Sequence, residues 1–243
     1  MERFSEAAVV LDARPYRERD LLLSALGENS GLLRGVLRGA RGRRHARGMA
    51  AAQVLSEVVL SGFQRPSAEL ATFTEIEVVR SSFPLGRDLA RAATAAAAAE
   101  LLLTFCQPGE PLPRHFRLAR GLLSALLGEA PPRTVLAYAL VWSLRLGGVF
   151  PEPGVCSACR EPIAPPLHLS GATGHPLCDR CAPPGSATLG ADALRFLEAS
   201  RSAAPTQPLP PPPEGLLRWL ERLARDEAHR RLRALEAWRT LAG

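Results

Sequence analysis

Residues 20–48 read DLLLSALGENSGLLRGVLRGARGRRHARG and predict two β-strands followed by a basic loop. Asp20–Leu26 and Leu32–Arg38 are rich in leucine and valine, and Gly27–Gly31 between them is a cluster of turn residues typical of a hairpin. Gly39–Gly48, which follows the second strand, contains only glycine, alanine, arginine and one histidine. A hairpin that ends in a cationic loop is the pattern from which we predict the fold of residues 1–80.

Three further segments of this N-terminal part have the composition of strands. They are rich in Val, Leu, Ile and Thr and are Ala7–Arg14, Gln53–Ser61 and Leu70–Val79. The basic loop then connects the third strand to the fourth. We therefore predict an α+β protein that begins with a five-stranded β-barrel of the oligonucleotide-binding (OB) type over 1–80, because strands and loops of that barrel present a binding groove. A small sandwich or an SH3-like barrel would show the same pattern.

The stretch Gly31–Gly48 contains six arginines and no acidic residue. The six are Arg34, Arg38, Arg41, Arg43, Arg44 and Arg47. A guanidinium group donates forked hydrogen bonds that match phosphate oxygens, so a run of arginines is typical of a surface that follows a nucleic-acid backbone. The alternative is a solvated loop that only increases solubility. We predict that these six residues bind DNA.

The hydrophobic period changes after residue 81, and residues 81–243 predict a helical domain. The core has to be built from Leu, Ala and Val, because the chain is 47% hydrophobic but only 5% aromatic. Such a composition favours helices. The predicted helices are Asp88–Cys106, Arg114–Leu127, Arg133–Leu146, Ala191–Ala199 and a C-terminal helix over 214–242 that follows a proline-rich spacer.

Four cysteines in two CxxC pairs predict a structural zinc site within a module over 151–185. The pairs are Cys156–Cys159 and Cys178–Cys181, and eighteen residues separate them. Four thiolates fill a tetrahedral site and leave no position for an activated water. His168 or His175 in the spacer can replace a cysteine, and the cysteines can instead be free or linked by disulfides. The fifth cysteine, Cys106, is expected to be an inert buried thiol.

Composition and missing motifs argue against an enzyme. The chain has 30 basic and 24 acidic residues, which gives a net charge of +6. All 30 basic residues are arginine, so mechanisms that need a catalytic or phosphate-binding lysine are excluded. The chain has no H-x-E of a zinc deaminase and no G-x-S-x-G elbow. It also has no leader pattern and no run of about 18 apolar residues, so we expect a soluble, cytoplasmic protein that does not enter a membrane.

Several segments resemble the bacterial recombination mediator family RecO. They are Val9–Leu11, Pro15–Leu22, Gly39–Arg41, the leucine-rich helix that ends at Leu146-Gly147, and Pro151 followed by Cys156-x-x-Cys159. The resemblance implies a protein that binds single- and double-stranded DNA, anneals complementary strands, works with RecR, and helps RecA replace single-strand-binding protein (SSB) during repair at the nucleoid. Relatives often have lysine in the basic tract, and some lack the cysteines. A transcription- or RNA-associated zinc-ribbon protein is the alternative.

The resemblance also implies that the helical domain binds the acidic, apolar C-terminal tail of SSB. Arg117 and Arg120 lie three residues apart beside Leu118, Leu122 and Leu123, so one helix can present both cations and an apolar pocket. We expect these two arginines to bind the tail, although they can also be ordinary solvated surface residues.

Overall fold

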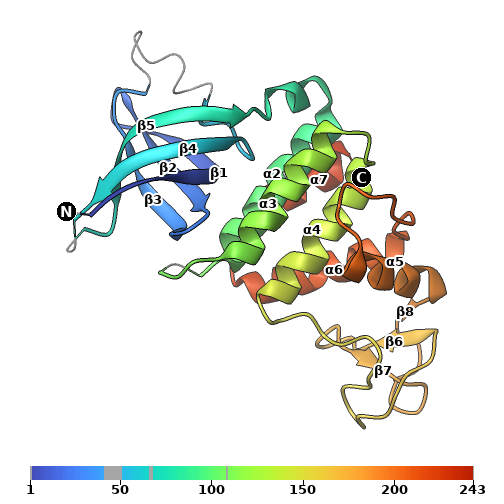
Figure 1. The fold of residues 1–243 in the computed structure, drawn as a ribbon. Coiled ribbons are helices and arrows are strands. Elements are labelled where there is room, and N and C mark those ends of the chain that lie inside the picture. Colours follow the sequence, from blue (N-terminus) through green and yellow to red (C-terminus); the bar gives the residue numbers. More distant parts are fainter. Residues whose placement is uncertain (1, 41–50, 66–67, 108, 243) are drawn as a thin grey trace.

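The computed structural model describes residues 2–40, 51–65, 68–107 and 109–242 as a β-barrel followed by a helical domain (Figure 1). The barrel strands are β1 (Glu2–Tyr16), β2 (Asp20–Gly27), β3 (Gly31–Leu37), β4 (Glu57–Gln64) and β5 (Ala71–Arg80). They close in the order β1-β2-β3-β5-β4. The β3–β5 pair is parallel, whereas the other neighbouring pairs are antiparallel. The predicted five-stranded OB-type barrel is confirmed.

The barrel is filled by the side chains that alternate inward along its strands. Leu23, Val58, Leu60 and Phe73 are fully buried, and the ring of Phe4 packs edge-on against Phe73 with centroids 6.1 Å apart. β1 begins at Glu2 and not at the predicted Ala7, because its first residues pair with the end of β4. Hydrogen bonding to a neighbouring strand thus extends β1 into a polar segment that has no apolar alternation of its own.

Six α-helices follow the barrel in the described residues. After a short 3₁₀ helix, η2 (Phe83–Arg87), they are α2 (Leu89–Phe105), α3 (Pro113–Leu127), α4 (Pro132–Leu146), α5 (Ala191–Ser202), α6 (Glu214–Ala228) and α7 (Arg233–Leu241). Asp88 ends the 3₁₀ helix and caps α2, since its carboxylate accepts hydrogen bonds from the N–H groups of Ala90 and Arg91 at 2.9 and 3.1 Å. No described helix has both the length and the apolar character needed to cross a membrane.

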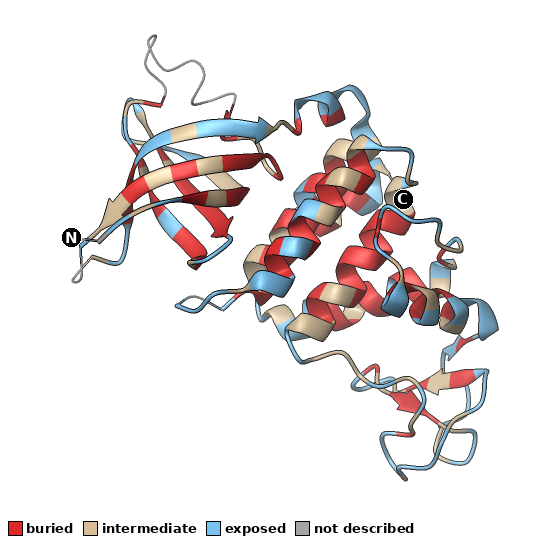
Figure 2. Cartoon of the chain, viewed as in Figure 1, coloured by how far each residue is buried: buried red, intermediate tan, exposed pale blue. Residues whose placement is uncertain are grey.

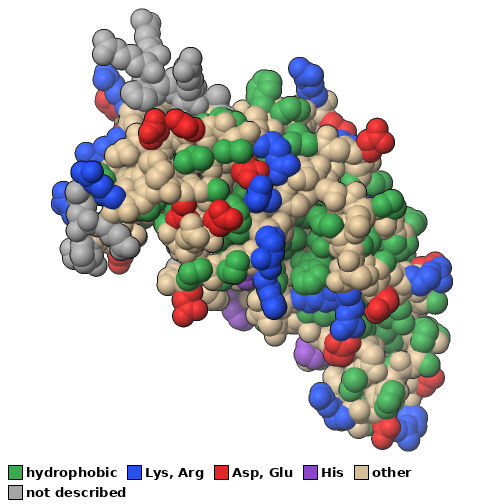
Figure 3. Space-filling model, in the orientation of Figure 1, with side chains coloured by type: hydrophobic (Ala, Val, Ile, Leu, Met, Phe, Trp, Pro, Cys, Tyr) green, Lys and Arg blue, Asp and Glu red, His purple; other side chains and the backbone are tan. Residues whose placement is uncertain are grey.

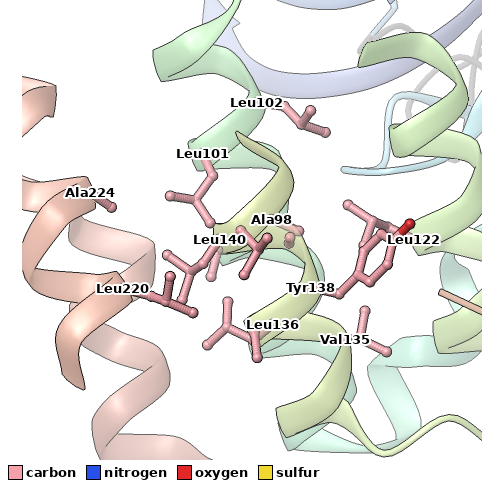
Figure 4. Close-up of a cluster of buried hydrophobic side chains, with 14 of the residues drawn as sticks. Ala98, Leu101, Leu102, Leu122, Val135, Leu136, Tyr138, Leu140, Leu220 and Ala224 are labelled. Carbon is pink, nitrogen blue, oxygen red and sulfur yellow. The ribbon is translucent and has the colours of Figure 1, made fainter. Parts of the chain in front are cut away.

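The helical core is centred on α2 and α4, whose residues are buried along most of their length (Figure 2). The alanines of α2 allow neighbouring helices to approach closely. Leu101 from α2, Leu136 and Leu140 from α4 and Leu220 from α6 meet in one cluster (Figure 4). This cluster holds α6, and with it the small module between α4 and α5 described below, against the helical bundle.

The single C-terminal helix predicted over 214–242 is instead two helices. His229 adopts a left-handed backbone conformation with φ 48°, which ends α6, and α7 then packs along α2. The side chain of Glu100 in α2 accepts hydrogen bonds from the N–H groups of Ala234 and Leu235 at the start of α7, at 2.9 and 3.0 Å. One straight helix would not bring its apolar residues into contact with both α4 and α2, so the chain has to turn.

The barrel is joined to the helical domain by a buried carboxylate at the start of β4. Glu57 forms salt bridges with Arg80 at the end of β5, at 3.1 Å, and with Arg120 of α3, at 2.6 Å. Arg80 also donates hydrogen bonds to the Ser124 hydroxyl and to the carbonyl of Arg120, at 2.7 and 3.2 Å. The hairpin residue Gly31, with φ 67°, adjoins the same domain, because a Cβ there would overlap the carbonyl oxygen of Glu110.

Between α4 and α5 the chain forms a small module with three short strands. They are β6 (Leu167–Leu169), β7 (Pro176–Leu177) and β8 (Thr188–Leu189), in the order β7-β6-β8. The module lies at the end of the molecule away from the barrel (Figure 1). These strands were not predicted, because segments of two or three residues are too short to show an alternating pattern.

Candidate metal centre and nucleic-acid interface

Four cysteine side chains meet in the module. The sulfur atoms of Cys156, Cys159, Cys178 and Cys181 all lie within 4.8 Å of one another. The Cys159 and Cys178 sulfurs are 3.7 Å apart. A tetrahedral ion with bonds of about 2.3 Å to sulfur requires sulfur–sulfur distances of about 3.8 Å. The Cys159–Cys178 pair has this spacing, and the four sulfurs lie close enough together to hold one metal ion.

Local hydrogen bonds bring the two CxxC turns together. The Arg160 N–H donates to the Cys156 carbonyl, and the Cys181 N–H donates to the Cys178 carbonyl, at 2.9 and 3.0 Å. The Ser157 N–H donates to the carbonyl of Pro176 in β7 at 2.9 Å and so joins the first turn to the strand that precedes the second turn. The β6–β7 hairpin is therefore the part of the spacer that folds the second cysteine pair back against the first.

The environment of the thiols favours deprotonation of Cys156. Hydrogen bonds from backbone groups of Cys159 and Cys178 lower the pKa of Cys156 to about 6. Interaction with the neighbouring Cys178 and Cys159 sulfurs raises the pKa of Cys181 to about 12. Four adjacent thiols thus do not all ionise together without a cation, and a divalent ion that replaces their protons would complete the site.

The fifth cysteine and the two spacer histidines lie outside the four-sulfur group. Burial raises the pKa of Cys106 to about 12, which agrees with the predicted inert thiol. The Nε2 atom of His168 lies 2.8 Å from a carboxylate oxygen of Asp179 instead of facing the sulfurs, and His175 is not part of the group either. The four cysteines are accordingly the candidate ligands.

Two of the six predicted DNA-binding arginines lie within the described residues. Arg34 on β3 and Arg38 directly after it are exposed, whereas the residues on either side of Arg34 are buried. The Asp20 carboxylate accepts a hydrogen bond from the Gly39 N–H at 2.9 Å and fixes the end of β3. Arg41, Arg43, Arg44 and Arg47 lie outside the described residues. β3 and the residue directly after it thus present two cations, and the other four arginines follow in the sequence.

The turn between β1 and β2 adds cations that the sequence pattern did not predict as binding residues. Arg17 and Arg19 are exposed there, and the Arg17 guanidinium lies 5.2 Å from the centre of the Tyr16 ring. In OB barrels the loop between the first two strands borders the ligand groove. A sequence pattern that could have identified Arg17 and Arg19 as binding residues is the aromatic Tyr16 next to arginines in a turn. Arginines also lie on the helical half of the face shown in Figure 3.

An open cavity of about 550 Å³ lies between α3, α4 and the segment that follows α5. We call it the α3–α4 groove, and its lining residues are Arg114, Arg117, Leu118, Gly121, Tyr138, Trp142, Leu146, Ala204 and Pro205. The Trp142 and Tyr138 side chains donate hydrogen bonds to the carbonyls of Ser200 and Ala203, at 2.9 and 3.1 Å, and so hold the segment after α5 against α4.

Only one of the two arginines predicted to bind a partner lines this groove. Arg117 is exposed at its edge. Arg120 lies on the side of α3 that faces the barrel, where it contacts Glu57 and the ring of Phe116. The expectation that both arginines form one site is therefore not supported by their positions, because Arg120 is neutralised by a buried carboxylate. Arg114 is the second arginine of the groove. Among the described residues, none from α6 or α7 lines the groove.

Two family models match the chain over most of its length. The recombination protein O N-terminal domain matches residues 1–82, and the recombination protein O C-terminal domain matches residues 86–230. The first match ends two residues after β5, and the second contains α2 to α6 and the four cysteines.

Curated relatives agree with these matches. The chain is 31% identical over 220 residues to DNA repair protein RecO of Anaeromyxobacter sp. (strain K), and the aligned region covers 87% of this chain and 86% of that protein. It is 31% identical over 209 residues to DNA repair protein RecO of Streptomyces avermitilis, with 82% of each chain covered. The chain belongs to the recombination protein O (RecO) family, which supports a role in DNA repair and recombination.

Proposed function

We propose that the chain is a non-catalytic mediator that binds single- and double-stranded DNA and anneals complementary strands. With RecR, it would help RecA replace SSB on DNA in the cytoplasm. The observation that best supports DNA binding is a pair of exposed arginines on an OB-type barrel, Arg34 on β3 and Arg38 directly after it. Four more arginines follow within nine residues of Arg38 and before any acidic residue. Neutralised phosphate charge then supplies the affinity, which needs no bound nucleotide.

Salt dependence tests this interface. If Arg41, Arg43, Arg44 and Arg47 each contact one phosphate of a single strand, they contribute about −0.7 each, or about −3 together, to the slope of log affinity against log salt. Replacing all four by Ala should remove this part of the slope, and replacing all four by Lys should keep most of it. An unchanged slope in the Ala variant would place the interface elsewhere. Parallel titrations with RNA test the alternative of an RNA-associated zinc-ribbon protein, which would prefer RNA to DNA.

We also propose that the four cysteines hold one zinc ion with a structural role. Thiolate ligands suit zinc, and the full set of four protein ligands leaves no open position for a reacting water. Elemental analysis of protein purified without chelator should find one zinc per chain. Protein that is folded in the 151–185 region but contains no zinc would refute the assignment.

The α3–α4 groove is our candidate for the SSB tail. Its apolar floor and the cations Arg114 and Arg117 complement a peptide that combines carboxylates with apolar side chains. Arg117→Glu should weaken the binding of a labelled tail peptide, with the effect largest at low salt. Arg195→Glu on α5 has the same change in charge outside the groove and is the control. Equal affinities of the two variants would exclude this groove.

A further inference from the structure

A second cavity lies between the metal-binding module and α6. Its volume is about 530 Å³, and we call it the α6 groove. Leu169, Gly171 and Pro183 line it from the module, and Arg218, Trp219 and Arg222 line it from α6. The two arginines are the only charged side chains in its lining among the described residues. An opening with apolar walls and two cations favours an anionic ligand.

The wall formed by the module is fixed to α6. The indole N–H of the buried Trp219 donates a hydrogen bond to the carbonyl of Gly174 at 2.7 Å. Arg222 donates to the carbonyls of Gly171 and Ala172, the latter at 3.3 Å, and its Nε atom lies 3.4 Å from a carboxylate oxygen of Asp226. These contacts use only part of the five N–H donors of the guanidinium, so Arg222 is held in place while it retains donors for a ligand.

Arg218 is the more available cation. It is exposed, and among the described residues no salt bridge to it is found. Glu214, one turn earlier on α6, has its carboxylate paired with Arg133. An exposed guanidinium at the edge of an apolar groove, without its own carboxylate partner, can bind an external anion without first breaking an internal salt bridge.

The cations form a row and do not converge on one point. Arg218, Arg222 and Arg225 are spaced four and three residues apart on α6, which places them along one side of the helix. Arg225 is exposed, and its only described hydrogen bond goes to the backbone carbonyl of Glu221. A linear polyanion complements such a row better than a single carboxylate does, because each successive charge meets a separate cation.

We propose that the α6 groove is a second binding site for the phosphodiester backbone of single-stranded DNA, separate from the barrel. Arg218 and Arg222 contact adjacent phosphates, and Leu169 and Pro183 provide apolar surface for a sugar or base. The proposal rests on the DNA-binding function proposed above. It extends that function, since one strand can reach both ends of the molecule or two strands can be held at once, as annealing requires.

The test compares Arg218→Glu with Arg195→Glu in the full-length, metal-loaded protein. Arg195 lies on α5, is exposed and pairs with Asp192, so the control has the same charge change on a surface outside the groove. Binding of a labelled oligothymidylate of about 30 nucleotides, roughly twice the largest site of one OB barrel, is followed by anisotropy at several salt concentrations. Arg218→Glu should reduce the salt slope by about 0.7 and lower the affinity severalfold relative to the control.

Hydrogen exchange provides a local readout. Addition of the oligonucleotide to the wild-type protein should slow exchange in residues 183–188 and 214–225, and this protection should disappear in Arg218→Glu. Equal salt slopes and equal protection in the two variants, with wild-type DNA binding intact, would overturn the second site alone. Loss of affinity for an acidic peptide but not for DNA in Arg218→Glu would overturn it in favour of a peptide site. Absence of DNA binding by the wild-type protein would instead refute the function proposed above.

Discussion

At the scale of the residue, Glu57 links the two halves of the molecule. Its buried carboxylate contacts one arginine from the barrel, Arg80, and one from α3, Arg120. The sequence pattern predicts a partner-binding role for Arg120, because its neighbours Leu118 and Leu122 suggest a groove. The position of Arg120 in α3 does not reveal that the Glu57 carboxylate, 63 residues earlier in the chain, contacts it from the side of the barrel. Contacts of this kind depend on tertiary structure and have no local sequence signal.

Glu57→Ala should lower the free energy of unfolding by about 1–3 kcal/mol, because the substitution leaves Arg80 partly buried without its carboxylate. The contribution of Arg120 is smaller, since its side chain is half exposed and solvent screens the pair. Chemical denaturation measures the change. Glu75→Ala, at an exposed position of β5, is the matched control and should stay within about 0.5 kcal/mol of the wild type. Equal effects of the two substitutions would show that the Glu57 salt bridges do not stabilise the fold.

At the scale of the element, the position of α7 depends on α2. The Glu100 side chain satisfies two N–H groups at the start of α7, and the indole N–H of Trp238 donates to the Thr94 hydroxyl at 2.8 Å. These contacts explain why the C-terminal segment is two helices. The helical period of residues 214–241 predicts the helical state of both segments. It does not predict the turn at His229, because the partner that favours the turn lies more than 100 residues earlier.

Glu100→Ala should destabilise the protein by about 0.5–2 kcal/mol, the range expected when a helix loses its capping side chain. Glu100→Gln should lose less, since its amide oxygen can still accept a hydrogen bond. Denaturation of the two variants, together with hydrogen exchange of residues 233–241, measures the effect. If α7 exchanged at the wild-type rate in Glu100→Ala, the carboxylate would not be what holds the helix.

Long elements with a clear hydrophobic period are the ones that the sequence predicts best. The barrel strands and α2, α3 and α4 occur where the residue patterns place them, within a few residues. The four-cysteine group is also predictable, because the spacing of two CxxC turns is a local property that the β6–β7 hairpin completes. The α3–α4 groove is predictable only in part. Its lining includes Ala204 and Pro205 from a segment that no pattern in α3 identifies.

At the scale of the whole molecule, the four-cysteine module and the helical bundle share part of one apolar core but differ in their other sources of stability. Leu167, Leu169 and Leu189 join the module to the apolar core of the helices, whereas the rest of the module depends on four thiols and three short strands. A chelator should therefore unfold residues 151–189 locally while the barrel and the bundle stay folded. Hydrogen exchange should increase in the module alone, and the helical circular dichroism signal should change little.

Two cysteine substitutions show whether metal binding depends on the four-cysteine group or on any cysteine of the chain. Cys159→Ser should abolish the binding of one zinc per chain, and Cys106→Ser, which removes the buried thiol at the C-cap of α2, should leave the metal content unchanged. Cooperative unfolding of the entire chain on chelation would contradict the independence of the module from the bundle.

If this RecO-family chain brings DNA strands together by binding their phosphates, as proposed above, it should accelerate the pairing of complementary strands. The most direct measurement is the annealing rate of two complementary DNA oligonucleotides, one with a donor dye and one with an acceptor, in the absence of any nucleotide cofactor. We expect the wild-type protein to accelerate annealing. Replacement by Ala of all six arginines of the stretch 31–48 should remove most of the acceleration; they are Arg34, Arg38, Arg41, Arg43, Arg44 and Arg47. Annealing no faster than that of the free strands, or an undiminished rate in the six-fold variant, would contradict the proposal.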